Sequence, residues 1–200
     1  NNIMKKIFSI LACSLMMVAC GDKSITINGD FSQFEMVAPD SKVELFINGS
    51  EEALATTTLD ANKSFTADIK VKGEQFVMLV INDSPMMELI TEGKDISFNY
   101  NAETMTIDYA EECLNQQLRD IKNGISEKMN ALYTIEEEAE AEALFAELRA
   151  YIDNAVVENK DNITSLKILQ YYMYYGEDEA RFAELFEMIN KKYAEQELYK

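Results

Sequence analysis

The spacing of hydrophobic residues changes once along this chain, near Asp108, and the change sets the fold class. Before Asp108, apolar and polar residues alternate, as at Ile25 and Ile27, which is typical of strands with one buried face. After it, apolar residues recur every three or four positions from Leu114 to Leu132, which is typical of an amphipathic helix. The pattern therefore predicts an α+β fold, with an N-terminal antiparallel β-sandwich or small barrel followed by an α-helical segment of about four helices.

Turn residues divide the first half of the chain into short strands. We expect strands at Ser24–Asn28, Lys42–Ile47, Phe65–Lys72, Phe76–Ile81, Met86–Ile90, Ile96–Tyr100 and Thr104–Ile107, with a hairpin turn at Asn48-Gly49. The continuous apolar run at Phe76–Ile81 predicts a central strand buried on both faces. Helices are expected at Leu114–Leu132, Ile135–Asn159 and Ile163–Tyr175, and a fourth from Glu177.

The N-terminus has the pattern of a secretory signal. Two lysines, Lys5 and Lys6, precede the apolar run Ile7–Val18. The small residue Ala19 and then Cys20 follow this run. As a helix this run spans about 18 Å, too short for a hydrocarbon core of roughly 30 Å. The alternative is a buried helix of the folded domain, but the run carries only serines, Ser9 and Ser14, as polar residues.

Cys20 directly follows the expected cut site and resembles the lipidated cysteine in the lipobox of bacterial lipoproteins. One departure is Met17, which stands where the lipobox usually has Leu. We expect translation to start at Met4, residues 1–19 to be the signal peptide, 20–108 the β module and 109–200 the helical segment. The resemblance implies a lipid-anchored protein of the bacterial cell envelope, at the periplasmic or surface face of the outer membrane.

Charge and composition exclude several classes of function. The formal net charge is −18, and it becomes −20 when Lys5 and Lys6 leave with the signal. Such an acidic chain is repelled by nucleic acid, so we expect no nucleic-acid partner. There is no histidine, which excludes Ser-His-Asp and Cys-His catalysis within this chain and removes the commonest zinc ligand. We expect no enzyme activity, no catalytic residue, no metal and no cofactor.

Cys113 is the candidate free thiol. Cys13 leaves with the signal and Cys20 is the expected lipid site, so no intramolecular disulfide can form in the mature protein. A helix start favours a thiolate, whereas the adjacent Glu111 and Glu112 disfavour it. The alternative is that Cys113 is simply a small buried hydrophobic residue.

Acidic residues offer only weak candidates for a site. The run Glu136–Glu138 with Glu140 and Glu142 lies where negative charge complements a helix dipole, and it lacks the spacing of a calcium loop. A carboxylate pair for glycoside hydrolysis is a third hypothesis. Its candidates are Glu103, Asp108, Glu111 and Glu112.

Four tyrosines crowd one turn of the third expected helix and could form a ligand or partner surface. They are Tyr171, Tyr172, Tyr174 and Tyr175. The alternative is core packing, which should involve at least two of the four.

The order of these segments resembles a known family. A lipobox precedes a strand-rich module containing Leu59–Phe65 and Met87–Ile96, and Glu158–Ile163 opens a helix. This arrangement resembles the N-terminal domain of unknown function of envelope-anchored thiol–disulfide oxidoreductases of the thioredoxin/AhpC-TSA type. The resemblance implies an accessory region that precedes a thioredoxin domain. This sequence has no Cys-x-x-Cys, so no redox residue is carried over, and the chain is either part of a longer reading frame or a stand-alone version.

The leading hypothesis is a non-catalytic, lipid-anchored module that positions or binds a partner. Its expected partners are the membrane, through the lipid on Cys20, and a protein or a thioredoxin-like domain. The second hypothesis is a stand-alone ligand- or protein-binding lipoprotein with no redox link.

Overall fold

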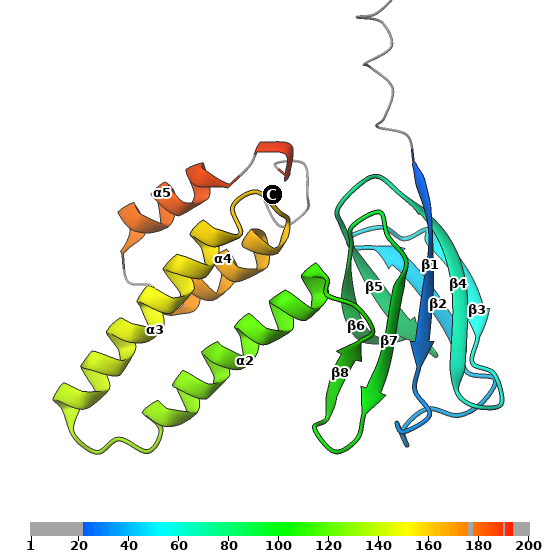
Figure 1. Cartoon of the computed structure of the whole chain (residues 1–200), viewed down its shortest axis with the longest axis horizontal. Helices are drawn as coiled ribbons and strands as arrows, with labels where there is room; N and C mark the ends of the chain where they lie inside the picture. The colour runs from blue at the N-terminus through cyan, green and yellow to red at the C-terminus, as the bar shows by residue number, and fades with distance from the viewer. Residues whose placement is uncertain (1–21, 176–177, 190, 194–200) are drawn as a thin grey trace, which may run out of the picture.

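The computed structural model describes residues 22–175, 178–189 and 191–193, and Figure 1 shows a strand module followed by a helical module. The strands are β1 (Lys23–Asp30), β2 (Lys42–Ile47), β3 (Ala53–Thr58), β4 (Ser64–Val71), β5 (Gln75–Ile81), β6 (Ser84–Thr91), β7 (Ile96–Asn101) and β8 (Thr106–Tyr109). The helices are α2 (Leu114–Leu132), α3 (Glu138–Glu158), α4 (Thr164–Tyr175) and α5 (Glu179–Met188), and the short 3-10 helix η1 (Lys191–Tyr193) follows.

The strands form a sandwich of two four-stranded sheets. One sheet has the order β4-β1-β7-β8 and the other β3-β2-β5-β6. Alternate residues of β4 are buried, and Phe65, Ala67 and Ile69 join the core between the sheets. Because burial follows the period of two that the sequence shows, the predicted sandwich followed by helices is confirmed.

One strand pair departs from the expected antiparallel arrangement. Among the described strands, β1 and β7 pair in parallel, with Ile27 opposite Ile96, whereas the other pairs are antiparallel. Alternation of apolar residues is the same in both arrangements, so the sequence pattern could not distinguish them. The last strand also lies two residues later than predicted, at Thr106–Tyr109, so that the β module ends just beyond Asp108.

The hairpin predicted at Asn48-Gly49 is present, and it leads into a strand that the sequence did not predict. Gly49 has a φ of 83°, and the chain continues into β3, which pairs with β2. β3 reads Ala-Leu-Ala-Thr-Thr-Thr, and none of its residues is fully buried. Its small, half-exposed residues give little contrast in hydrophobicity between the two faces of the strand. The sequence pattern therefore does not predict a strand there.

The continuous apolar run of β5 has a structural reason, because its side chains contribute to two cores. Val77 and Leu79 point into the sandwich, whereas Phe76 belongs to the core of the helical module. Burial on the outer face is complete at Phe76 and partial at Met78 and Val80. The prediction of a strand buried on both faces therefore holds only for its first part.

The helical module packs around its own core. This core includes Leu118 and Ile125 of α2, Leu148 and Ile152 of α3, and Leu185 of α5. The four predicted helices are confirmed, although α3 begins at Glu138 rather than at Ile135. No helix of the described residues has the length and apolar content needed to cross a membrane.

Candidate functional site

The candidate site lies where the helical module meets the outer face of the β3-β2-β5-β6 sheet. Phe76 of β5 and Ile90 of β6 are 2% and 1% exposed, and both lie in the helical core. They are opposite each other in adjacent strands, so they form one apolar contact surface on the sheet. The helices therefore pack against the outer face of the sheet, and the two modules share a core there.

Asn115 of α2 seals the open edge of this sheet. β6 is an edge strand, and the backbone N–H of Ile90 donates to Asn115 Oδ1 at 2.6 Å. Asn115 Nδ2 donates in return to the carbonyl oxygen of Ile90 at 2.7 Å, and Asn115 is 5% exposed. A side-chain amide has one acceptor and one donor side, so it can replace a neighbouring strand at this position.

Two carboxylates of the β module hold the starts of two helices. Glu92, in the turn after β6, accepts a hydrogen bond from the N–H of Leu114, the first residue of α2, at 2.8 Å. Glu74, in the turn before β5, accepts one from the N–H of Ile163, just before α4, at 2.8 Å. The first N–H groups of a helix lack partners within the helix, and negative charge there is favourable. These contacts fix α2 and α4 against the sandwich.

A partly buried ion pair crosses the same junction. Lys167 Nζ of α4 lies 2.9 Å from Glu88 Oε1 of β6 and 5.0 Å from the centre of the Phe76 ring. Asn48 Nδ2 donates to the other carboxylate oxygen of Glu88 at 3.1 Å. The side chains of Lys167 and Glu88 are 16% and 18% exposed, so this pair is shielded from water on most sides.

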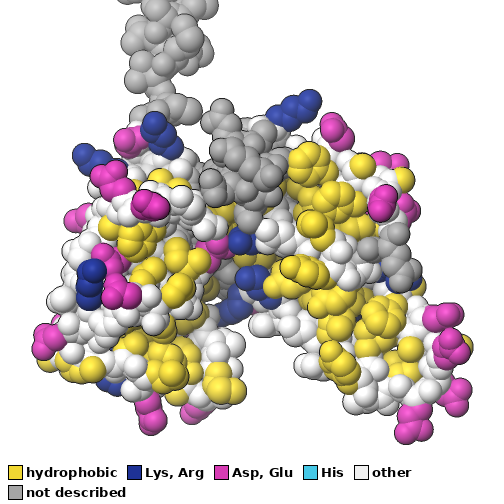
Figure 2. Space-filling model, turned by 180° about the vertical axis from the view of Figure 1, so that it is seen from behind, with side chains coloured by type: hydrophobic (Ala, Val, Ile, Leu, Met, Phe, Trp, Pro, Cys, Tyr) yellow, Lys and Arg dark blue, Asp and Glu magenta, His cyan; other side chains and the backbone are white. Residues whose placement is uncertain are grey.

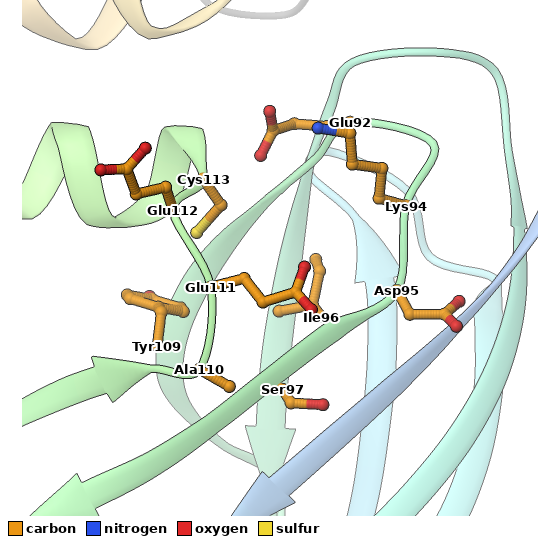
Figure 3. A pocket seen from close by; sticks show the side chains of 10 residues that line it. All are labelled: Glu92, Lys94, Asp95, Ile96, Ser97, Tyr109, Ala110, Glu111, Glu112 and Cys113. Carbon is orange, nitrogen blue, oxygen red and sulfur yellow. The ribbon is translucent and has the colours of Figure 1, made fainter.

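Two adjoining cavities open at the junction. One has a volume of about 330 Å³ and is lined by residues that follow β6 and β8, shown in Figure 3. The other has a volume of about 570 Å³ and lies along α2 and the end of α3. Glu92, Glu112 and Cys113 belong to the walls of both.

Cys113 is a free thiol at this place, as the sequence suggested. It is half-buried at the start of α2, and in Figure 3 its sulfur points towards Tyr109 and Ile96. Burial raises the pKa of Tyr109, and negative charge on the neighbouring Cys113 would raise it further. Tyr109 is thus a neutral hydroxyl beside the thiol at physiological pH.

Two of the acidic residues around the cavities accept hydrogen bonds from backbone N–H groups. Glu92 caps α2, and Asp95 accepts a hydrogen bond from the N–H of Thr26 at 2.8 Å. Among the described residues, no group of three or more Asp, Glu or Cys side chains could hold a metal ion.

Of the carboxylates proposed for glycoside hydrolysis, Glu103 lies apart from the other three. Glu103 is in the turn after β7, at the far end of β8 from Glu111 and Glu112. Asp108 is engaged by Arg119, whose Nη1 lies 3.3 Å from its carboxylate. The acidic run that begins at Glu136 is largely exposed at the start of α3.

The four tyrosines do not share one environment. Tyr172 is 5% exposed within the helical core, and Tyr171 and Tyr175 pack against that core. Tyr174 is 81% exposed. Cys20, the expected lipid site, lies outside the described residues.

Sequence reasoning did not find the residues that build the junction. Glu88 had one visible signal, because it interrupts the otherwise apolar run Met86–Ile90. Asn115 and Lys167 had none, since their roles depend on partners far along the chain. Comparison with protein-family models, curated proteins and solved structures finds no match to this chain.

Proposed function

We propose that this protein is a lipid-anchored envelope module without catalytic activity, which positions or binds a partner protein. The observation that carries the proposal is the place of β1. Only Gly21 and Asp22 separate Cys20 from the first strand, which begins at Lys23. At about 3.5 Å per residue, a lipid on Cys20 would keep the sandwich within about 11 Å of the attachment point.

The arrangement around β1 supports a defined orientation at the membrane. The side chain of Lys23 packs against Gly93, in the same turn that holds Glu92 at the start of α2. The anchored end would therefore be the end at which the two modules are joined. Figure 1 shows the connection between α2 and α3 at the opposite end of the molecule.

The carboxylates at the junction hold the two modules together. The junction carboxylates Glu74, Glu88 and Glu92 bind helix N–H groups or Lys167. A positioning or partner-binding role agrees with the resemblance to the accessory region of thioredoxin-like oxidoreductases.

Membrane fractionation tests the anchor. The wild-type chain, expressed in a bacterium that processes lipoproteins, should sediment with the envelope membranes, and Cys20→Ser should appear in the soluble fraction. Cys113→Ser is the matched control, because it removes the other cysteine of the mature chain and should leave the protein at the membrane. A Cys20→Ser chain that has lost residues 1–19 and still stays at the membrane would overturn the proposal.

The redox link is tested separately. Sequencing of the DNA beyond the codon for Lys200 distinguishes two versions of the proposal. An in-frame continuation with Cys-x-x-Cys would make this chain the accessory region of a redox protein. A stop codon would favour a stand-alone binding lipoprotein.

A further inference from the structure

A shallow apolar depression lies on the outer face of the β3-β2-β5-β6 sheet, beside the helices. It has a volume of about 250 Å³, and its walls include Phe46, Ile47 and Met78. Phe46 and Met78 are opposite each other in β2 and β5, and Met78 is opposite Glu88 in β6. With strands about 4.8 Å apart, the depression lies next to the ion pair of the junction.

The depression connects to positive side chains through Asn48, which lines it and donates to Glu88, the partner of Lys167. Figure 2 shows Lys and Arg side chains gathered in the hollow between the two modules, next to hydrophobic side chains of the sandwich. Lys122 lies seven residues after Asn115, two helical turns along α2, and therefore on the face that Asn115 turns towards β6. Its charge interacts with those of Glu88 and Lys167.

Among the described residues, Lys122 is the cation of this group that makes no hydrogen bond or ion pair, although it feels the charge of Glu88. Lys167 is paired with Glu88, whereas no hydrogen bond or ion pair joins Lys122 to a described residue. The three side chains Lys122, Lys167 and Glu88 thus carry one uncompensated positive charge. Burial lowers the pKa of Lys122, the charge of Glu88 partly offsets this, and Lys167 lowers the pKa further. The side chain keeps contact with solvent.

We propose that this hollow binds a small amphiphilic monoanion, with its carboxylate on Lys122 and its alkyl chain on Phe46 and Met78. One uncompensated charge matches one carboxylate. A ligand with several negative charges would be repelled by a chain of formal net charge −18. Ligand sites usually enclose about 300–1,000 Å³, so a depression below that range suits a medium alkyl chain rather than a whole phospholipid.

Calorimetric titration with decanoate tests the proposal. The full chain carries Cys20→Ser in every variant and is studied without detergent, so the test does not depend on the anchor. We expect binding of one decanoate per chain and no comparable binding of methyl decanoate or decyltrimethylammonium. Lys122→Ala should weaken binding about tenfold, the effect of losing one hydrogen bond to a charged group, and Lys122→Arg should retain it.

Lys128→Ala is the matched control. It removes one positive charge from the same helix, but Lys128 lies over the ring of Tyr151, on the side of α3. We expect it to bind decanoate like the parent chain, and Met78→Gln to bind more weakly. An equal loss of affinity for decanoate in Lys122→Ala and Lys128→Ala would overturn the proposal. Binding of a tetraglutamate peptide in place of decanoate would also overturn it and assign the hollow to an acidic protein partner.

Discussion

Asn115 satisfies two buried backbone groups with one side chain. Its amide bonds to both the N–H and the carbonyl oxygen of Ile90, at the edge of the sheet. Asn115→Ala would leave both groups without a partner, so we expect the free energy of unfolding to fall by about 2–5 kcal/mol in urea denaturation. Asn123→Ala, at an exposed position of the same helix, is the control and should change it by less than about 0.5 kcal/mol. Equal stability of the two variants would contradict the edge-sealing role.

The positive charge of Lys122 lowers the stability of the folded protein. Its pKa is lowered in the folded state, so the folded protein binds this proton less tightly than the unfolded chain does. Below the lowered pKa the charged form carries the full unfavourable effect, which fades as pH rises towards the unfolded value near 10.5. We expect Lys122→Met to have a higher free energy of unfolding than wild type at pH 7. This difference should be smaller at pH 10. A difference that is constant with pH in chemical denaturation would contradict this account.

At the scale of secondary-structure elements, the start of α2 depends on a residue from another module. Cys113 precedes the helix without a side-chain cap, and Glu92 accepts the hydrogen bond from Leu114 instead. Glu92→Ala should lower the free energy of unfolding by about 0.5–2 kcal/mol. It should also speed amide exchange in the first turn of α2.

Glu112→Ala is the control for this change. Glu112 lines the same two cavities and is exposed, so its removal should leave amide exchange in α2 unchanged. Faster exchange in both variants would point to a general effect of charge rather than to the cap.

The tyrosines of α4 separate into packed and exposed members. Tyr172 is 5% exposed, and Tyr172→Ala should cost about 3–5 kcal/mol of unfolding free energy, as for other large aromatic residues in cores. Tyr174 is 81% exposed, and Tyr174→Ala should change stability by less than about 0.5 kcal/mol. Thermal or urea denaturation measures both. A large cost at Tyr174 would contradict this separation, because its ring contacts only that of Tyr175 among the ring pairs of the described residues.

These elements also show how far the sequence alone could lead. Periodicity predicted the sandwich and the helices, because local burial sets both patterns. It missed β3, whose alanines and threonines give little contrast, and the parallel pairing of β1 with β7, which leaves no local signal. The junction was beyond prediction for the same reason, since Asn115 and Ile90 meet only after both modules have folded.

At the scale of the whole molecule, the two modules form one continuous body. A shared core at Phe76 and Ile90, two capped helices and the ion pair between Lys167 and Glu88 all cross the junction. These contacts join the two modules into one body. Its acidic run at the start of α3 lies at the opposite end from β1 in Figure 1, so an anchor at Cys20 would hold this negative charge away from anionic lipid.

Mass spectrometry of the N-terminal peptide of the purified mature protein tests the anchor most directly. We predict a chain that begins at Cys20 and carries covalently attached acyl chains on that residue. An unacylated Cys20, or a mature chain that begins at another residue, would contradict the account.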